Sequence, residues 1–466
     1  MTPSGPSCRN GACFGISYTR LSGDNKTVVP DEHSVWQADK KEVKPGDTVT
    51  LSWQNSEKVI FHMAVSLDEH YLFHVHQQVE NLSGHDISIT PYAYVNRVYE
   101  IPKQAPFLHE GPLGVMGGTL NEVSYKELKE KGNKSYEDAS GWFGITDKYW
   151  LTALIPDGEH YKVAYSHYLK KDQDRYQVDY LGTASSVSNG AKYDQDVRLF
   201  IGAKELKILD HYANGDDATH DAPIPLFDRA LDFGVFYFLA KPMCMAVNML
   251  FLATGNFGIA LLLFILIVKA FMFPLANKSF KSMAQMRTLQ PEIAKIREKY
   301  VDDQIAMHKA TRELYKREKI NPAAGCLPVL IQIIVFLALF RGLNVTIEMR
   351  HAPFYGWITD LSAADPSNLF TAFGLLPWNT PGFLHLGFLP MLYCLTMIIQ
   401  TSLQPPPPDP VQAKMMKFMP FMMLIFFDKM ASGFVLYWTW SNLISILQQR
   451  FITDRHKKSV TPAHVV

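Results

Sequence analysis

The chain is poor in the features that mark several common protein classes. It has only five cysteines in 466 residues, without a CxxC pair or a Cys/His spacing suited to zinc. Its 45 Lys and Arg balance its 45 Asp and Glu, and no region is broadly basic with interleaved aromatic residues, which argues against nucleic-acid binding. Its N-terminal half shows no nucleophile elbow, paired-carboxylate site or phosphate-binding loop. We predict no catalytic residue, no cofactor and no metal site, and a protein that is not an enzyme.

A charged run in the N-terminal half and the five cysteines do not indicate a functional site. The charged run Tyr125–Tyr136 is interpreted as solvated. Cys244, Cys326 and Cys394 lie in or beside apolar segments, where a cysteine is usually a small buried apolar residue. Cys8 and Cys13 form a close pair near the N-terminus and could form a disulfide if that end of the chain is exported.

Residues 1–230 also lack any apolar run of membrane length. Short segments alternate with turn signals, and in Asp47–Gln54 and Lys58–Leu67 apolar side chains fall at every second position. This period indicates half-buried strands, repeated often enough to predict an antiparallel β-sandwich of roughly 200 residues. His74 and His76 share one strand face and could together bind a metal ion. No third metal ligand lies near them in sequence, so we interpret them as solvent-facing.

The second half of the chain carries apolar segments that approach the length of a membrane helix, about 20 residues. The five core spans that we predict are 257–275, 324–343, 384–403, 415–427 and 433–451. The last two are separated only by DKMAS and indicate a tight helical hairpin, whose first arm is short for a bilayer of about 30 Å. Residues 234–253 are interrupted by Lys241, Pro242 and Asn248. We interpret them as a helix in the outer interface, with a sixth span as the alternative.

Basic loops set the orientation of these spans. Residues 277–322 hold 11 Lys or Arg against 6 Asp or Glu, a net charge of +5, so we predict this segment to be cytoplasmic. The tail Arg455–Lys458 then lies on the same side, and the N-terminal half lies outside, in a bacterial periplasm. An exported domain needs a signal peptide or an anchor, and MTPSGPSCRNGACFG contains neither. We therefore expect a missing first transmembrane segment, lost by truncation or by a start codon assigned too late.

The basic segment 277–322 is predicted to form two helices. Residues at four-and-three spacing give the first helix one apolar seam: Leu289, Ile293, Ile296 and Tyr300. Asp302 or Asp303 can cap the second helix, and the Asn-Pro pair at 321–322 ends it. Such a hairpin is either a solvated element without a partner or a surface for lipid head groups, a ribosome or an emerging chain.

One cation, Lys269, lies inside the first predicted core span. A Lys near mid-span costs roughly 2.5–3.5 kcal/mol, so such a residue tends to face a polar cavity. The alternative is that the long side chain carries its ammonium to the interface. Helical side chains lean toward the helix N-terminus, which here points away from the cytoplasmic exit and favours the polar cavity.

From about Asp232 to Gln449 the chain resembles the YidC/Oxa/Alb family of membrane protein insertases. The runs that carry this resemblance are IVKAFMFPL, KSMAQMRTLQPEIAKIREKY, NPAAGCLPVLIQIIVFLAL, KMMKFMPFMMLIFF and SGFVLYWTWSNLISILQQ. The N-terminal half resembles the periplasmic β-sandwich of the Gram-negative members, with Gly141–Trp150 (GWFGITDKYW) as its best match. The implied organisation is a β-sandwich domain at 1–215, a linker with an interfacial helix at 216–254, a first core span at 255–276, a cytoplasmic hairpin at 277–322, four further transmembrane helices at 323–452 and a basic tail at 453–466.

The resemblance implies a multi-pass protein of the bacterial inner membrane that inserts nascent membrane proteins, alone or with the Sec translocon. It implies a hydrophilic groove open to cytoplasm and lipid, and the ribosome and the lipid bilayer as further partners. The groove residues that it implies are Lys269, Gln332, Gln400, Tyr437, Trp438, Ser441 and Asn442. Lys269 stands where the family more often has Arg, so the charge is kept but the bidentate fork is lost.

Two other classes of protein are alternatives. A secondary transporter would use Lys269 in a polar substrate cavity, but the spans show no inverted repeat and no matching pair of broken helices. A protein whose spans merely tether the β-sandwich would not need Lys269, Gln332 and the short hairpin together. The chain also departs from the family at Ile334 and Ala431, which replace frequent prolines, and Ser367–Phe383 looks inserted.

Overall fold

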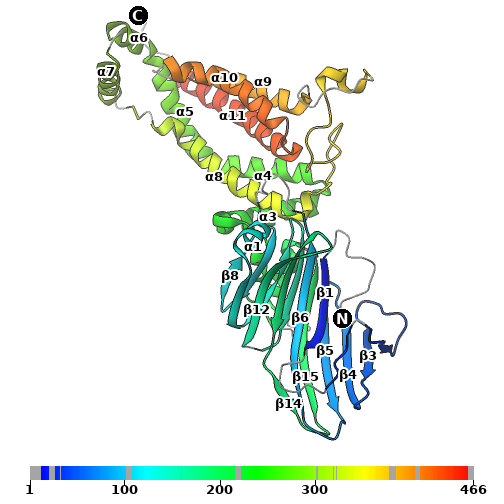
Figure 1. The fold of residues 1–466 in the computed structure, drawn as a ribbon. Helices are drawn as coiled ribbons and strands as arrows, with labels where there is room; N and C mark the ends of the chain where they lie inside the picture. The colour runs from blue at the N-terminus through cyan, green and yellow to red at the C-terminus, as the bar shows by residue number, and fades with distance from the viewer. Residues whose placement is uncertain are drawn as a thin grey trace, which may run out of the picture. The chain divides into compact units, whose positions relative to one another are not determined.

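Figure 1 shows the fold of the chain in a computed structural model. The structure describes residues 12–19, 27–31, 33–100, 108–158, 160–215, 222–300, 303–318, 320–321, 323–376, 385–404 and 410–459. They form two compact units, the first made of residues up to Asp232 together with Val345–Ile347, and the second of Phe233–Asn344 and the residues from Glu348 onward. The domain bounds implied by the resemblance stay a prediction. Cys8 of the close N-terminal cysteine pair and part of the segment that looks inserted lie outside the described residues.

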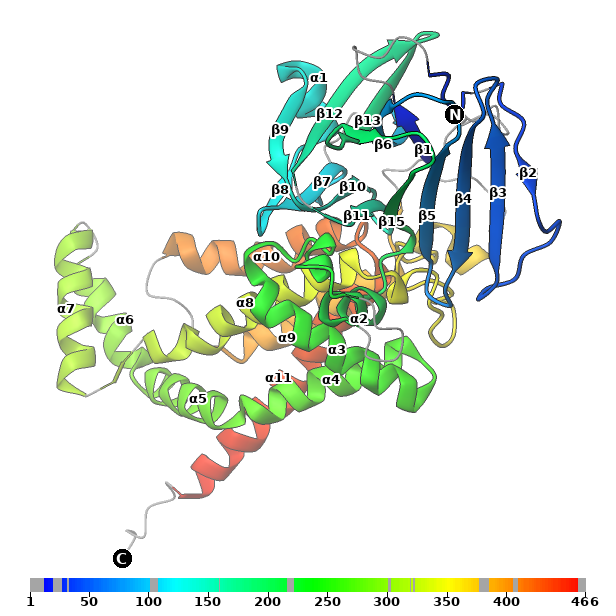
Figure 2. The same cartoon turned by 90° about the horizontal axis from the view of Figure 1, so that it is seen from below.

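The described part of the first unit contains two antiparallel sheets. The six-stranded sheet has the order β1 (Ala12–Thr19), β6 (Ile87–Val98), β13 (Gln173–Leu181), β12 (Tyr161–Lys170) and β9 (Lys134–Ala139), with β14 (Ser185–Val187) paired to β6. The nine-stranded sheet has the order β2 (Gln37–Ala38), β3 (Thr48–Gln54), β4 (Val59–Leu67), β5 (Leu72–Asn81), β15 (Lys192–Ala203), β11 (Trp150–Pro156), β10 (Gly141–Thr146), β7 (Gly111–Met116) and β8 (Thr119–Glu122). Figure 2 shows β2 to β5 in this order at one edge of the larger sheet.

The two strands predicted from their period of two are β3 and β4, and both predictions are confirmed. They pair antiparallel, with Val49 opposite Val65 and Trp53 opposite Phe61. The rings of Trp53 and Phe61 lie 5.6 Å apart, and aromatic pairs across strands stabilise a sheet. The alternation therefore gives both the strand type and the face that packs inward.

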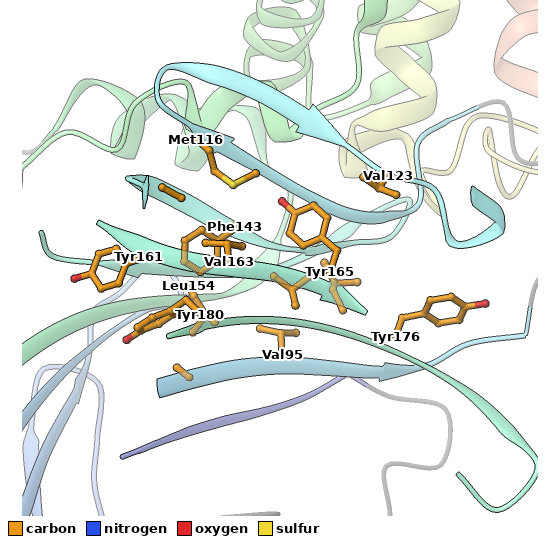
Figure 3. Close-up of a cluster of buried hydrophobic side chains, with 14 of the residues drawn as sticks. Val95, Met116, Val123, Phe143, Leu154, Tyr161, Val163, Tyr165, Tyr176 and Tyr180 are labelled. Carbon is orange, nitrogen blue, oxygen red and sulfur yellow. The ribbon is translucent and has the colours of Figure 1, made fainter. Parts of the chain in front are cut away.

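Both sheets contribute to one buried core. Phe143 and Leu154 come from the nine-stranded sheet, Val163 and Tyr180 come from the six-stranded sheet, and all four side chains are 0% exposed. Figure 3 shows these residues gathered between the strands. Burying an apolar side chain of this size contributes about 1.5–3 kcal/mol relative to leaving it in water. The predicted antiparallel β-sandwich is confirmed, and its stability comes from the space between its sheets.

The prediction that Tyr125–Tyr136 is a solvated charge run is wrong for its apolar members. Helix α1 (Tyr125–Lys131) begins there, with Ser124 as its cap, and Tyr125 and Leu128 are only 2% and 1% exposed. Because positions three apart share a helix face, these two side chains enter the sandwich core while the charges face solvent. The many charged residues of this run made its short amphipathic helix hard to predict from the sequence.

A buried cation follows the last strand of the larger sheet. Lys204 is 2% exposed, and its ammonium donates to Thr146 Oγ1 at 2.9 Å. Burial lowers the pKa of Lys204 from 10.5 to about 8, although the nearby carboxylates of Asp147 and Asp232 favour the charged form. Arg97 also pairs with Asp147, at 2.5 Å. The first unit therefore contains a cluster of buried charges beside its apolar core.

The second unit is helical. Its described α-helices are α3 (Tyr237–Thr254), α4 (Phe257–Phe271), α5 (Phe273–Thr288), α6 (Gln290–Lys299), α7 (Gln304–Arg317), α8 (Ala323–Val345), α9 (Phe388–Ser402), α10 (Pro410–Phe427) and α11 (Ser432–Ser459), and α2 (Leu206–Asn214) belongs to the first unit. Short 3₁₀ turns lie at Gly234–Phe236, Ile347–Met349 and Leu369–Gly374, and a further one, Phe227–Ala230, lies in the first unit. Helix α9 contacts both α10 and α11, and α11 also contacts α4. The last four predicted spans correspond to α8, α9, α10 and α11.

The first three helices of this unit differ in whether each is long enough to cross a membrane. Among the described helices, Gly234–Thr254 is long and apolar enough by itself to cross a membrane. Phe257–Phe271 and Phe273–Thr288 pass the same test only as one bent pair. Pro242 lies inside α3 without ending it, so this helix is less interrupted than its sequence indicates. Its position in the outer interface stays a prediction.

The first predicted core span, 257–275, is not one straight helix. Helix α4 ends at Phe271, and α5 leaves it at an angle of 65°, a change of direction that Figure 1 shows. Pro274 lies in the first turn of α5. Proline has no amide hydrogen, and its ring clashes with the carbonyl four residues earlier. The bend therefore has a local cause, and Lys269 lies in the last turn before it.

Residues 290–317 form the two predicted helices, α6 and α7, whereas residues 277–288 of the basic segment continue helix α5. Leu289 and Ile293 pack against Leu314 of α7, and the Asp303 carboxylate caps α7 by accepting from the amide of Ala306 at 2.9 Å. Arg317 also pairs with Glu292 across the two helices, at 2.9 Å. The cap is confirmed, and so is the apolar seam for Leu289, Ile293 and Ile296, which pack in one cluster without Tyr300. Helix α7 ends at Arg317, before the Asn-Pro pair that was predicted to end it. The two helices form a hairpin with its own small core.

Candidate functional site

Helices α4 and α11 bring the intramembrane cation to a hydroxyl group. The Lys269 ammonium donates to Ser445 Oγ at 2.8 Å. In the described part of the chain no carboxylate pairs with this ammonium, so its charge is held in place without being neutralised. The carbonyl of Lys269 lies in the last turn of α4, where intrahelical partners are missing, and it accepts from Gln448 at 3.4 Å. Both ends of the residue are thus tied to α11.

Helix α8 brings a second polar group to the same face of α11. Gln332 Nε2 donates to the hydroxyl of Tyr437 at 2.9 Å and to Ser441 Oγ at 2.8 Å. Three residues predicted for the groove therefore meet in one hydrogen-bonded group. A side-chain amide in a membrane helix needs such partners, because hydrocarbon offers none.

The two polar groups lie along one line of α11. Tyr437, Ser441 and Ser445 follow each other at intervals of four residues, which places them on one helix face. We call these three residues, with Gln332 and Lys269, the polar stripe. Its hydroxyl groups extend over eight residues, or about 12 Å of helix. Ser445 was missed from the sequence, although its spacing from Ser441 was the signal that could have found it.

Aromatic side chains border the polar stripe. The ring of Trp438 lies 4.8 Å from that of Phe336 on α8 and 6.3 Å from that of Phe427 at the end of α10. Its indole Nε1 is buried and has no hydrogen-bond partner among the described residues. Phe336 also contacts Tyr437, at 5.5 Å. The site therefore places polar groups directly beside an apolar wall.

The two remaining predicted residues lie apart from this group. Asn442 Nδ2 donates to Thr396 Oγ1 at 3.4 Å, which joins α11 to α9 instead of to Gln332. Gln400 makes no side-chain hydrogen bond with another described residue. Asn442 follows Ser441 directly, and a step of one residue turns a helix by about 100°. Asn442 therefore lies on a different face of α11 from Ser441.

Comparison with known proteins decides the family. Residues 249–459 match the family described as 60Kd inner membrane protein, and residues 14–246 match the YidC periplasmic domain. The membrane protein insertase YidC of Rickettsia bellii is 43% identical over 440 residues, which cover 94% of this chain and 78% of that protein. The chain belongs to the YidC insertase family. YidC of Rickettsia conorii is 42% identical over 435 residues, covering 93% of this chain and 77% of that protein.

A solved structure described as an active YidC insertase with its first transmembrane domain resolved was also found. It is 19% identical, covers 93% of this chain and 82% of that chain, and aligns with a TM-score of 0.41.

Family membership confirms several predictions. The chain is a YidC membrane protein insertase of the inner membrane with a periplasmic domain, and it acts without enzymatic catalysis. Its substrates are nascent membrane proteins. The alternatives of a secondary transporter and of a tethered β-sandwich are set aside. The roles of the individual site residues stay predictions.

Proposed function

We propose that the polar stripe is the wall of the groove through which YidC passengers pass. The hydrogen bonds from Gln332 and Lys269 to one face of α11 are the observation that carries this proposal. A polar passenger segment that meets hydroxyl, amide and ammonium groups keeps hydrogen-bond partners that hydrocarbon would remove. The groove therefore lowers the desolvation cost of moving such a segment into the membrane.

The charge of Lys269 adds selectivity for acidic passenger segments. The ammonium has three donors, of which one is directed to Ser445, and a passenger carboxylate can take another. The attraction is stronger in this low-dielectric surrounding than in water. The apolar helix of the passenger then leaves sideways into lipid, which is favourable by about 0.8 kcal/mol per buried CH₂ group. No chemical step and no cofactor is required.

The hairpin of α6 and α7 is proposed to receive the passenger on the cytoplasmic side. Residues 277–322, which contain it, have a net charge of +5, of which residues 290–317 contribute +2 (7 Lys or Arg against 5 Asp or Glu). The core formed by Leu289, Ile293 and Leu314 keeps the hairpin folded. A basic segment of this kind attracts anionic lipid head groups. The Sec translocon is the further partner that the resemblance implies.

Site-specific photocrosslinking to a stalled, ribosome-bound chain with a single span tests this proposal. Probes at positions 269, 332 and 438 are expected to crosslink to the passenger, and a probe at 295 on the hairpin is expected to crosslink to it at shorter chain lengths. Matched controls are Ile267 and Ile334, which are 57% and 50% exposed and lie two residues from Lys269 and Gln332 on the same helices. Two residues turn a helix by about 200°.

The outcomes separate the proposals. Crosslinks at 269, 332 and 438 and none at the two controls support a passenger groove. Equal crosslinking at these three positions and at the controls would contradict it, because the passenger would then be meeting the bundle from lipid. Crosslinks in the stripe without any at 295 would remove the hairpin from the pathway.

A further inference from the structure

Polar side chains are buried where α9, α10 and α11 meet, at the end of the second unit that is predicted to face the periplasm. Asp365, Asn368, Asp428 and Ser432 are 2%, 7%, 8% and 0% exposed. Ser432 begins α11 five residues before Tyr437, about 8 Å along the helix. Buried carboxylates are costly unless they are hydrogen-bonded, so two of them in one place need a structural reason.

The two carboxylates hold the start of α9. Asp428 Oδ1 accepts from the amide of Gly387 at 2.8 Å, and Asp365 Oδ2 accepts from the amide of Leu389 at 2.7 Å. The first amides of a helix have no partner within it, and its N-terminal dipole favours negative charge. Glycine is needed at 387, because a Cβ there would lie 2.9 Å from the Cβ of Asp365.

The loop that contains Asp365 also holds the start of α11. The carbonyl of Ala363 accepts from the amide of Ser432 at 2.7 Å and from its hydroxyl at 2.9 Å. Ala364 and Ala431 form an antiparallel bridge beside it. The loop is therefore joined to α9 and α11, and Asp428, just after α10, joins the third helix to them.

Two further contacts complete this cluster. Ser367 Oγ accepts from the amide of Phe388 at 2.9 Å and donates to Asp365 Oδ1 at 2.7 Å. His385 Nδ1 lies 3.0 and 3.1 Å from the two carboxylate oxygens of Asp428, and its side chain is 30% exposed. The cluster is thus hydrogen-bonded inside and covered outside by an imidazole.

We propose that residues 363–368 with His385, Gly387, Asp428 and Ser432 form a periplasmic clasp that keeps the proposed groove closed on the periplasmic side. This inference rests on the polar stripe being the groove. The ends of α9, α10 and α11 can separate only if several hydrogen bonds to charged groups break together, and such bonds are the stronger ones. Asp365 and Asp428 are positioning residues in this role, because they act on helix ends and touch no passenger.

Labelling of the full chain in proteoliposomes tests the clasp. A reporter cysteine is introduced as Phe336→Cys, one helical turn from Gln332, after the five natural cysteines have been replaced. A membrane-impermeant maleimide is expected to react slowly from the periplasmic side of the wild-type clasp. Asp428→Ala is expected to raise that rate by about tenfold, as for the loss of one hydrogen bond to a charged group. Asp428→Asn keeps an acceptor oxygen and is expected to raise it less.

An engineered disulfide provides a second test of the clasp if the Asp428→Ala variant does not fold. Ala364→Cys with Ala431→Cys joins two bridge partners whose spacing suits a disulfide, and it locks the clasp shut. The locked protein is expected to insert passengers at the wild-type rate. Wild-type labelling of a folded Asp428→Ala variant, or loss of insertion on locking, would overturn the clasp. Absence of passenger crosslinks at 269 and 332 would instead overturn the groove, so the two failures are distinguishable.

Discussion

At the scale of single residues, Lys269 differs from an ordinary buried cation because its partner is a hydroxyl. A carboxylate partner would neutralise the charge, and a buried ion pair is hard to open for a ligand. Ser445 fixes the direction of the ammonium at 2.8 Å and leaves its charge intact. The arrangement suits a group that must be ready for a succession of different acidic passengers.

Lys269→Ala is expected to weaken insertion of passengers whose exported tails are acidic, by about tenfold, since a hydrogen bond to a charged group contributes roughly 1.5–3 kcal/mol. Lys269→Arg keeps the charge and is expected to retain most of the activity. Protease protection of the exported tail measures insertion. A control passenger with a neutral tail should lose little, and an equal loss for both passengers would mean that the charge of Lys269 is not what matters.

Lys204 predicts a pH dependence for the first unit. The folded state releases the Lys204 proton near pH 8, whereas an unfolded chain keeps it to about pH 10.5. Between these values unfolding takes up a proton, so raising the pH stabilises the fold, by about 1–3 kcal/mol. Hydrogen exchange in β10 and β11 measures this at pH 7 to 10. The difference between wild type and Lys204→Met should grow in favour of the wild type as the pH rises, and a constant difference would contradict the assignment.

At the scale of elements, hydrophobic pattern predicted most of the secondary structure. The period of two in β3 and β4 and the apolar seam of α6 follow directly from side-chain spacing. The hydrophobic pattern did not predict the bend between α4 and α5, which depends on a single missing amide hydrogen. The run 257–275 is apolar throughout, yet the amide hydrogen missing from Pro274 divides it, and no hydropathy scale reports that loss. The amphipathic helix α1 was missed because its seven residues give too short a period to recognise.

Pro274→Ala is expected to reduce the 65° bend between α4 and α5, because alanine restores the amide and removes the ring clash. Spin labels at positions 259 and 285 would report a longer distance when the two helices become more collinear. The hairpin would then move away from the polar stripe, and insertion should fall without loss of the passenger crosslink at 332. An unchanged distance would assign the bend to tertiary packing instead.

At the scale of the whole molecule, sequence predicted the division into a β-sandwich and a helical bundle, because the two halves have different solvents. It placed Lys269, Gln332, Tyr437 and Ser441 at one site through resemblance, and the structure brings them together in two hydrogen-bonded groups. Long-range partners such as Asp365 with Leu389 could not be predicted. They join segments that have no shared pattern and meet only after the helices have packed.

The row of hydroxyls along α11 has a consequence for how passengers are chosen. A hydroxyl donates or accepts as its neighbour requires, so Tyr437, Ser441 and Ser445 present no fixed order of donors and acceptors that a particular side chain would match. The hydroxyl groups therefore do not discriminate between polar passenger segments, and within the polar stripe only the charge of Lys269 favours one kind of segment, the acidic one. Any finer choice of passenger must depend on features outside these hydroxyl groups.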